Sequence, residues 1–558
     1  MEKDGIFGRN LIALSKFNPA LCALLSNVRI TGGRYKFIDS RTGDLIPALV
    51  DPSGTARPLH STVDPRKEAR RLIDSQEDEN FLILLGLGAA YYAEAALERN
   101  NISMALVIEF DLEGLAELLC RLDYTCLFSD PRFRLLVDPS GAELKQQILD
   151  LYRPVLCGGI RVIPLRSRTS FDTQLLNQAA GIISSAIEKI SADYSVQAHF
   201  GKRWFSNIIR NLKNIEETRQ ALPPVERAAV TAAGPSLSMQ IERLREKREG
   251  LFLIAADTSL PCLLNAGIIP DAVISIDCQH IGYYHFMDGL PEGVKLFLDL
   301  ASPPLLASMA KQRYFFSCGH PLTRYISGTW RALPELDSSG GNVTYAAVSL
   351  ADQMGAAEIE LYGADYSYPC GISYARGTYI YSFFTKRQSR LSPLEAQASA
   401  FLFRTPLEKK LKDGAWYYET KTLNFYREKL EEKSESLKAA LIPIEGMGAS
   451  INLRQDRRRK TGTQNASPPK AAGNTEKAPL KPEEFLSGYR NDIKNLPDPG
   501  KNSSRDLSLL GGENLDVFIS LLPTAAALKH RHHGADFREL LEETKKFCLR
   551  EIDTVLTQ

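Results

Sequence analysis

The sequence predicts an α/β protein with a central doubly wound, mainly parallel sheet, an α/β region before it and a helical region after it. Between residues 227 and 362, short apolar runs alternate with helical patterns, as they do when parallel strands are covered by helices on both faces. A shorter pattern of the same kind lies between residues 81 and 109. The last residues carry apolar side chains at helical spacing, which is typical of an amphipathic helix.

The length and composition indicate a globular protein of several domains. The 558 residues exceed the roughly 250 to 300 at which a single core stops growing. Apolar residues make up 44% and charged residues 24%, which is ordinary globular usage. A formal net charge of +1 gives no field that would attract a polyanion. We therefore expect no nucleic-acid partner.

The cysteines and the N-terminus favour a cytoplasmic location. Nine cysteines are scattered without a Cys-x-x-Cys pair or zinc spacing, so we interpret them as reduced thiols. The charged N-terminus precedes no apolar stretch of signal-peptide form, and no apolar run reaches the roughly 18 residues of a membrane span. We expect a cytoplasmic protein without an integral membrane segment.

Residues 1–190 form the predicted N-terminal α/β domain. Glycine and proline punctuation between residues 30 and 60 predicts small antiparallel hairpins. The apolar run 81–85 then ends in Gly86-Leu87-Gly88, and a helical stretch leads to a second run that ends at Glu109. This is the opening of a Rossmann-like unit. Tyr91 stands where a dinucleotide fingerprint needs a third small residue, so a tight turn is favoured over a cofactor site.

The remainder of the chain divides into five predicted segments. A helical connector (191–224) precedes the central domain (225–400), which is followed by a helical extension (401–453), a disordered linker (454–483) and a C-terminal helical module (484–558). The linker is rich in Arg, Lys, Pro and Ser, a composition that cannot form a core. Central strands are predicted at 227–232, 251–256, 272–276, 294–298, 313–317 and 358–362, and helices from 236 and at 258–266 and 344–354.

The first strand of the central domain runs directly into the loop Ala233-Gly234-Pro235-Ser236. Small residues allow a ligand to approach the backbone, and the following helix offers free N–H groups and a partial positive charge. The loop therefore predicts a phosphate site, although an ordinary helix cap by Ser236 explains it equally well.

Three later strands are followed by an acidic residue, namely Asp257, Asp277 and Asp365. Ligands of open α/β sheets bind outside the carboxyl ends of the strands. Asp257 and Asp277 would suit ribose or sugar hydroxyls, and Asp257 could equally cap a helix.

These motifs together resemble the motility-associated factor (Maf) flagellin glycosyltransferases. The resemblance rests on Gly234-Pro235-Ser236-Leu237, Ala256-Asp257-Thr258-Ser259 and Ser275-Ile276-Asp277, and on Pro58-Leu59-His60-Ser61 in the N-terminal domain. Ser339-Gly340-Gly341-Asn342 and Gly363-x-Asp365 are similar to motifs of bacterial sialyltransferases. The resemblance spans roughly residues 25 to 450, and it implies a Rossmann-like, sialyltransferase-like central domain.

The resemblance implies transfer of a nonulosonic acid, such as pseudaminic or legionaminic acid, from its CMP ester to serine or threonine of flagellin. The partners would be a CMP-nonulosonate and flagellin, and the role would be flagellar assembly and motility. Residues implied to hold the nucleotide and phosphate are Ala233, Gly234, Pro235, Ser236, Asp257, Ser339, Gly340, Gly341 and Asn342. No cofactor is required and no metal site is predicted, since the chain has no Asp-x-Asp motif; an assisting Mg²⁺ ion stays open.

The general base is the point at which the chain departs from the family. The family suggests a histidine where this sequence has Tyr374, and a phenol is a poor base at neutral pH. The catalytic candidates are therefore Asp277, Asp365 and Tyr374, with His280, His285 and His320 as further histidines of the domain.

Two alternatives remain open. The Gly-Pro-Ser fold also resembles archaeal 6-hydroxymethyl-dihydropterin diphosphokinases, which would use ATP and magnesium, although the large N-terminal domain favours a macromolecular acceptor. The missing histidine also fits a non-catalytic protein that binds a nucleotide sugar or flagellin.

Overall fold

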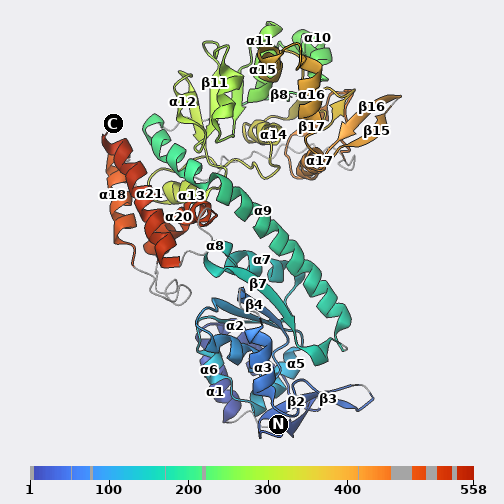
Figure 1. Cartoon of the computed structure of the whole chain (residues 1–558), viewed down its shortest axis with the longest axis vertical. Coiled ribbons are helices and arrows are strands. Elements are labelled where there is room, and N and C mark those ends of the chain that lie inside the picture. The colour runs from blue at the N-terminus through green and yellow to red at the C-terminus, as the bar shows by residue number, and fades with distance from the viewer. Residues whose placement is uncertain are drawn as a thin grey trace. The chain divides into compact units, whose positions relative to one another are not determined.

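The computed structural model describes residues 5–51, 53–75, 79–169, 171–215, 222–412, 414–453, 480–497, 512–530 and 537–557. Its contacts divide the chain into two compact units (Figure 1). The first unit holds Met1–Gly201 and Ile493–Lys546, and the second holds Lys202–Asp492 and Phe547–Gln558. Most of the predicted linker, residues 454–479, lies outside the described residues.

The first unit begins with two helices and a small antiparallel sheet. The helices are α1 (Ile6–Ser15) and α2 (Pro19–Asn27), and the strands are β1 (Tyr35–Asp39), β2 (Leu45–Val50) and β3 (Ala56–Pro58). Their order is β1-β2-β3, with both pairs antiparallel. The hairpins predicted between residues 30 and 60 are thus present.

A four-stranded parallel sheet forms the centre of the first unit. Its order is β6-β5-β4-β7, with β4 (Glu79–Leu85), β5 (Met104–Glu109), β6 (Phe133–Val137) and β7 (Gly159–Pro164). The helices around it are α3 (Pro65–Asp74), α4 (Tyr91–Glu98), α5 (Leu112–Arg121), α6 (Thr125–Phe128), α7 (Gly141–Leu151) and α8 (Pro154–Cys157). Residues 81–85 of β4 are all buried, because side chains on both faces of a covered parallel strand meet a core. The predicted strand, glycine turn, helix and strand between residues 81 and 109 are confirmed.

Three helices contain residues of both units. They are α9 (Thr173–Asn211), α18 (Pro482–Asn495) and α21 (Phe537–Thr557). The first part of α9 packs Leu176, Ala179 and Ile183 against one face of the four-stranded sheet. Helix α20 (Glu513–Lys529) belongs to the first unit, where Lys529 donates to the carbonyl oxygens of Pro154 and Val155. Within the described residues, no helix is both long and apolar enough to span a membrane.

The second unit contains the predicted doubly wound sheet. Seven parallel strands have the order β12-β11-β10-β9-β8-β13-β17. The strands are β8 (Arg227–Thr231), β9 (Phe252–Ala256), β10 (Ala272–Ser275), β11 (Lys295–Asp299), β12 (Arg313–Phe316), β13 (Glu358–Tyr362) and β17 (Ala440–Pro443). The helices are α10 (Leu237–Lys247), α11 (Leu260–Asn265), α12 (Pro304–Ala307), α13 (Pro321–Thr329) and α14 (Val343–Gln353). The order reverses between β8 and β13, and such a switch point is where open α/β sheets bind ligands.

The region after β13 differs from its prediction. Helices α15 (Tyr379–Arg387) and α16 (Leu394–Leu402) are followed by β15 (Glu408–Lys412), β16 (Ala415–Glu419), α17 (Lys421–Ser434) and then β17. Strands β15 and β16 form an antiparallel sheet with β14 (Tyr368–Pro369). Residues 401–453, predicted as a helical extension, thus contain three strands as well as a helix. The pattern concealed β15 and β17 because both are short, partly exposed strands at the edge of a sheet, where apolar alternation is weak.

Candidate functional site

Acidic side chains lie at the carboxyl ends of four strands of the seven-stranded sheet, three of which (β9, β10 and β11) are neighbours. Asp257 follows β9, Asp277 follows β10, Asp299 ends β11 and Asp365 follows β13. Asp257, Asp299 and Asp365 are buried. Asp299 was missed in the sequence, although it comes directly after the predicted strand 294–298 and the rule that found the other three would have found it.

The Asp365 side chain packs against the Gly-Pro-Ser loop. Its carboxylate accepts hydrogen bonds from the N–H of Ser236 at 2.8 Å and from the Ser236 hydroxyl. A Cβ on Gly234 would collide with this carboxylate and with the carbonyl oxygen of Gly363, so only glycine allows the two loops to approach so closely. The Ser236 side chain makes no capping bond to α10. A carboxylate of the chain itself therefore occupies the anion position at the start of this helix.

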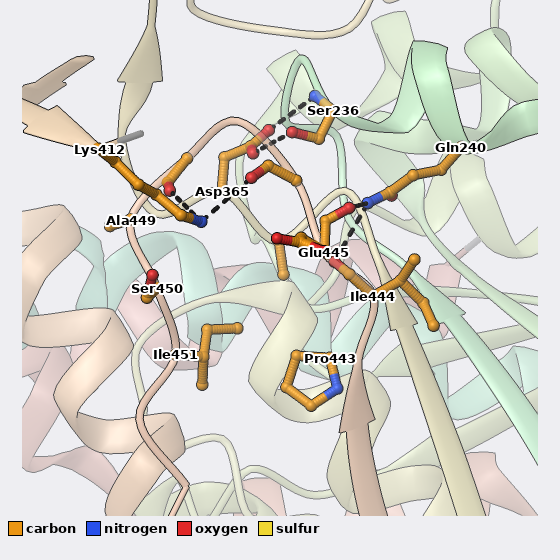
Figure 2. A pocket seen from close by; sticks show the side chains of 13 residues that line it. Ser236, Gln240, Asp365, Lys412, Pro443, Ile444, Glu445, Ala449, Ser450 and Ile451 are labelled. Atoms are coloured by element: carbon orange, nitrogen blue, oxygen red, sulfur yellow. Dashed lines mark hydrogen bonds between the residues drawn. The ribbon is translucent and has the colours of Figure 1, made fainter. Parts of the chain in front are cut away.

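A cavity of about 370 Å³ borders this pair (Figure 2). Its wall consists of Ser236, Gln240, Ala364, Asp365, Lys412, Pro443, Ile444, Glu445, Gly446, Gly448, Ala449, Ser450 and Ile451. Lys412 donates to the carbonyl oxygens of Gly446 and Gly448, each at 3.2 Å. Burial raises the pKa of Asp365, while bonds from Ser236 and Gly448 and the charge of Lys412 oppose this.

The loop after β17 closes this cavity and was not recognised in the sequence. The N–H of Met447 donates to the Ser236 hydroxyl at 2.8 Å, and the Gln240 side chain donates to the carbonyl of Glu445, also at 2.8 Å. Gly446 and Gly448 have no room for a Cβ beside Ser236 and Asp365. The glycines of Glu445-Gly446-Met447-Gly448 were the available signal, but without the position of β17 they could not be placed.

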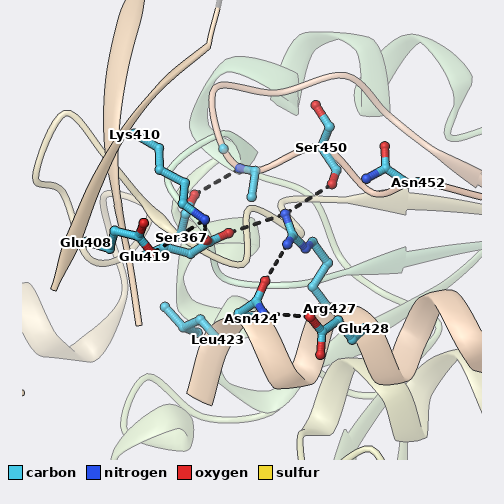
Figure 3. Close-up of polar contacts among 12 residues, drawn as sticks. Ser367, Glu408, Lys410, Glu419, Leu423, Asn424, Arg427, Glu428, Ser450 and Asn452 are labelled. Atoms are coloured by element: carbon cyan, nitrogen blue, oxygen red, sulfur yellow. Dashed lines mark hydrogen bonds and ion pairs between the residues drawn. The ribbon is translucent and has the colours of Figure 1, made fainter. Parts of the chain in front are cut away.

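Ion pairs of the buried Glu419 join the β15–β16 hairpin to α17, and a hydrogen bond ties the loop after β17 to Ser367 (Figure 3). Glu419 at the end of β16 is buried between Lys410, at 2.5 Å, and Arg427 of α17, at 3.3 Å. The N–H of Ala449 donates to the hydroxyl of Ser367 at 3.0 Å. Because both partners of Glu419 are cations, its burial is compensated, and β15, β16 and α17 are held as one structure.

A second group of polar residues surrounds Asp257. Its carboxylate accepts from the Ser275 hydroxyl at 2.6 Å and from the N–H of Thr258 at 2.7 Å. Asp277 accepts from the N–H of Gln279 at 2.8 Å. Burial, together with the charge of Asp257, raises the pKa of Asp277. The two carboxylates therefore lie near each other, at the ends of the neighbouring strands β9 and β10.

Tyr374 belongs to the same group. Burial raises the pKa of its phenol to about 12, with smaller contributions from Tyr368, Tyr379 and Asp257, while the charge of Arg404 lowers it. The N–H of Ala375 donates to the carbonyl of Ala233 at 2.9 Å, so this segment lies against the Gly-Pro-Ser loop. Arg404 was missed in the sequence, because it falls in the region predicted as a helical extension.

The loop 339–342 forms local hydrogen bonds at the start of α14. Asn342 accepts from the N–H of Tyr345 at 3.0 Å, and Asp337 accepts from the N–H of Ser339 at 3.0 Å. Burial would raise the pKa of Asp337, but hydrogen bonds from Lys433, Ser339 and Tyr345 hold it well below its usual range. Gly341 has a positive φ of 73°, which glycine adopts without strain. The contacts described for this loop organise the helix start rather than join it to Ser236.

Among the residues that the structure describes, no group of three or more His, Cys, Asp or Glu side chains is placed to hold a metal ion.

Comparison with known proteins places this domain in a family. Residues 202–371 match the model described as 6-hydroxymethylpterin diphosphokinase MptE-like. A protein of Treponema pallidum (strain Nichols), described as uncharacterized, is 33% identical over 166 residues, which are 29% of this chain and 79% of that protein. The chain contains an MptE-like domain. A second uncharacterized T. pallidum protein is 33% identical over 152 residues, and this chain covers 54% of its length; for a third, at 27% identity over 218 residues, it covers 38%.

The fold of this MptE-like protein matches a solved structure over nearly its whole length. The structure of the MAf glycosyltransferase from Magnetospirillum magneticum AMB-1 aligns with a TM-score of 0.60 and 13% identity, covering 99% of this chain and 95% of that chain. The similarity to the Maf glycosyltransferases inferred from the sequence motifs is therefore confirmed at the level of the fold.

Proposed function

We propose that the protein is a Maf-type glycosyltransferase that transfers a nonulosonic acid from its CMP ester to serine or threonine of flagellin in the cytoplasm. The observation that carries this proposal is the group formed by Asp257, Asp277 and Tyr374 outside the carboxyl ends of β9 and β10. The full-length likeness to the MAf glycosyltransferase supports it.

Each residue of the group has a role in this proposal. The Tyr374 phenol stays protonated at neutral pH and can donate a hydrogen bond to the donor phosphate, whose charge Arg404 offsets. Asp257 and Asp277 accept hydrogen bonds from ribose or sugar hydroxyls. Residues 233–236 border the donor, and residues 339–342 contact the nucleotide. Preorganised hydrogen-bond donors of this kind stabilise a leaving phosphate without a cofactor.

A second candidate follows from the family match itself. Residues 202–371 match MptE-like proteins described as 6-hydroxymethylpterin diphosphokinase-like, so pyrophosphorylation of a pterin alcohol by ATP and magnesium is the competing enzyme activity. A nucleotide-sugar-binding or flagellin-binding protein without turnover is the non-enzymatic alternative.

Ligand-induced thermal stabilisation tests these proposals. A ligand at 100 times its Kd stabilises by about 2.7 kcal/mol, so the melting temperature should rise with CMP and not with ATP-magnesium or a pterin alcohol. Asp257→Asn and Tyr374→Phe should weaken the CMP shift. Their matched controls are Asp288→Asn and Tyr283→Phe, which change exposed residues of the same unit and should leave the shift unchanged.

The transfer itself is measured as CMP release from CMP-pseudaminic or CMP-legionaminic acid in the presence of flagellin. Stabilisation by ATP-magnesium or pterin alone would refute the glycosyltransferase proposal in favour of the diphosphokinase. Stabilisation by CMP without turnover would favour the binding protein.

A further inference from the structure

The three histidines of the second unit that the sequence left as candidates differ in their surroundings. His280 is exposed. His285 lies 3.3 Å from the Thr258 hydroxyl through Nε2, and its Nδ1 is buried without a hydrogen-bond partner among the described residues. The Nε2 of His320 lies 2.9 Å from Oδ2 of Asp299. The His320 side chain is 16% exposed, while that of Asp299 is 2% exposed. Only His320 thus combines a fixed orientation with access to solvent.

The carboxylate decides which nitrogen of His320 carries the proton. An ionised carboxylate can only accept, so Nε2–H is the donor and Nδ1 is the unprotonated nitrogen of the neutral ring. The ring of Trp204 packs on the imidazole with centroids 4.4 Å apart. Helix α13 starts at Pro321, directly after His320. The imidazole is therefore held in one tautomer and one orientation, as a general base requires.

The pair lies at the same edge of the sheet as the proposed donor site. Asp299 ends β11, and His320 follows β12. Cys278, the residue after Asp277, lies close to both the pair and the proposed donor site. Burial raises the pKa of its thiol to about 12, and the charges of Asp277 and of Asp299 both add to this rise. Asp277 and Asp299 are thus both close to the Cys278 thiol.

Other charged groups lie near the pair. Arg324 of α13 lies beside Gly319, and Arg203 of α9 acts on Cys278. Asp299 and Asp337 both raise the pKa of the partly buried Cys318 thiol, after desolvation. A pH profile must therefore be compared between variants of His320 and Asp299, because neighbouring groups contribute to the absolute midpoint.

We propose that His320, oriented by Asp299, is the general base of the sugar transfer, a role that rests on the proposed glycosyltransferase function. The acceptor hydroxyl loses its proton to Nδ1 of His320, and its oxygen bonds to the anomeric carbon of the donor. The bond from that carbon to the phosphate oxygen breaks, and CMP leaves with the electron pair. The Asp299 carboxylate stabilises the imidazolium that forms.

The test compares His320→Gln, Asp299→Asn and the control His280→Gln in the full chain. Glutamine can keep a hydrogen bond to Asp299 but cannot act as a base. We expect His320→Gln to lower kcat for CMP release in the presence of flagellin by about 10² to 10⁴, to leave the CMP-induced thermal shift unchanged, and to remove the acid limb of the kcat/KM profile. Asp299→Asn should lower kcat while keeping a shifted acid limb, and His280→Gln should behave as wild type.

The proposal is overturned if His320→Gln keeps the wild-type pH profile, or if it loses CMP binding together with activity. If His320→Gln does not fold, Asp299→Asn decides, because it retains the imidazole: an unchanged kcat would refute the pair. Failure of the glycosyltransferase function is seen separately, because the wild-type protein would then show no CMP release from either donor.

Discussion

The two glycine loops of this protein have similar local designs and different surroundings. Gly86-Leu87-Gly88 follows β4 in the first unit, and Gly234-Pro235-Ser236 follows β8 in the second. In each, a carboxylate from the end of the neighbouring strand accepts a loop N–H: Glu109 accepts from Leu87 at 3.0 Å, and Asp365 accepts from Ser236 at 2.8 Å. The chain therefore fills the anion position of both loops with its own acid.

The difference lies in the countercharge and in the space around it. Glu109 is fully buried and pairs at 2.5 Å with Arg168, which is buried as well. His60 accepts from the N–H of Ala89 at 2.9 Å, and a Cβ on Gly88 would lie 2.5 Å from its ring. Asp365 instead borders a cavity, and Lys412, whose charge acts on it, donates its hydrogen bonds to backbone carbonyls. The first glycine loop is therefore fully packed, because a buried arginine pairs with its carboxylate. The second loop has no such buried partner among the described residues and lies beside a cavity.

The largest expected effect comes from removing the buried countercharge. Arg168→Met leaves Glu109 buried and unpaired, which should cost about 3 to 5 kcal/mol. The loss is measured by denaturant unfolding together with hydrogen exchange of the β4 and β5 amides. Replacing both partners, in Arg168→Met with Glu109→Gln, should recover much of it, because no unpaired charge is left. A cost below about 1 kcal/mol would mean that the pair does not seal the loop.

The second effect is a loss of stability in acid that depends on His60. Burial lowers the pKa of His60 to about 3, from 6.5, so the unfolded chain binds a proton below pH 6.5 and the folded chain does not. The stability is therefore present above pH 6.5 and is lost as pH falls toward 3, by about 2 to 3 kcal/mol at pH 4.5. His60→Gln should flatten this dependence in unfolding measured from pH 7.5 to 4.5. His199→Gln, at an exposed histidine of the same unit, should not; equal slopes for the two variants would rule out His60.

The smallest effects are expected at the open loop. Asp365→Asn turns an amide NH₂ or a weaker acceptor toward the Ser236 donors and should cost about 1 to 2 kcal/mol. Lys412→Met should cost less than about 1 kcal/mol, because this lysine is partly exposed and binds backbone carbonyls. Unfolding of both variants checks the order. If Lys412→Met lowered the free energy of unfolding as much as Arg168→Met, the proposed difference between the two loops would be wrong.

The sequence by itself determined the elements and the edge of the sheet where function is expected. The buried run 81–85 and the alternation from 227 to 362 predicted strands and helices that the structure contains, because hydrophobic periodicity is a local property. The predicted strand ends placed Asp257, Asp277 and Asp365 after strands. The same rule, used on the predicted strand 294–298, would have found Asp299. It also identified Gly86 and Gly88 as turn residues.

Tertiary structure alone decided which side chains meet. Asp365 reaches Ser236, 129 positions earlier, because β13 pairs with β8, and strand order is not encoded in local periodicity. Edge strand β17 brings the loop 444–451 to the cavity, and Arg168 reaches Glu109 only once β7 lies beside β4. Ion pairs, buried hydrogen bonds and cavities depend on contacts between distant segments, so the partners of the candidate residues follow from the folded chain.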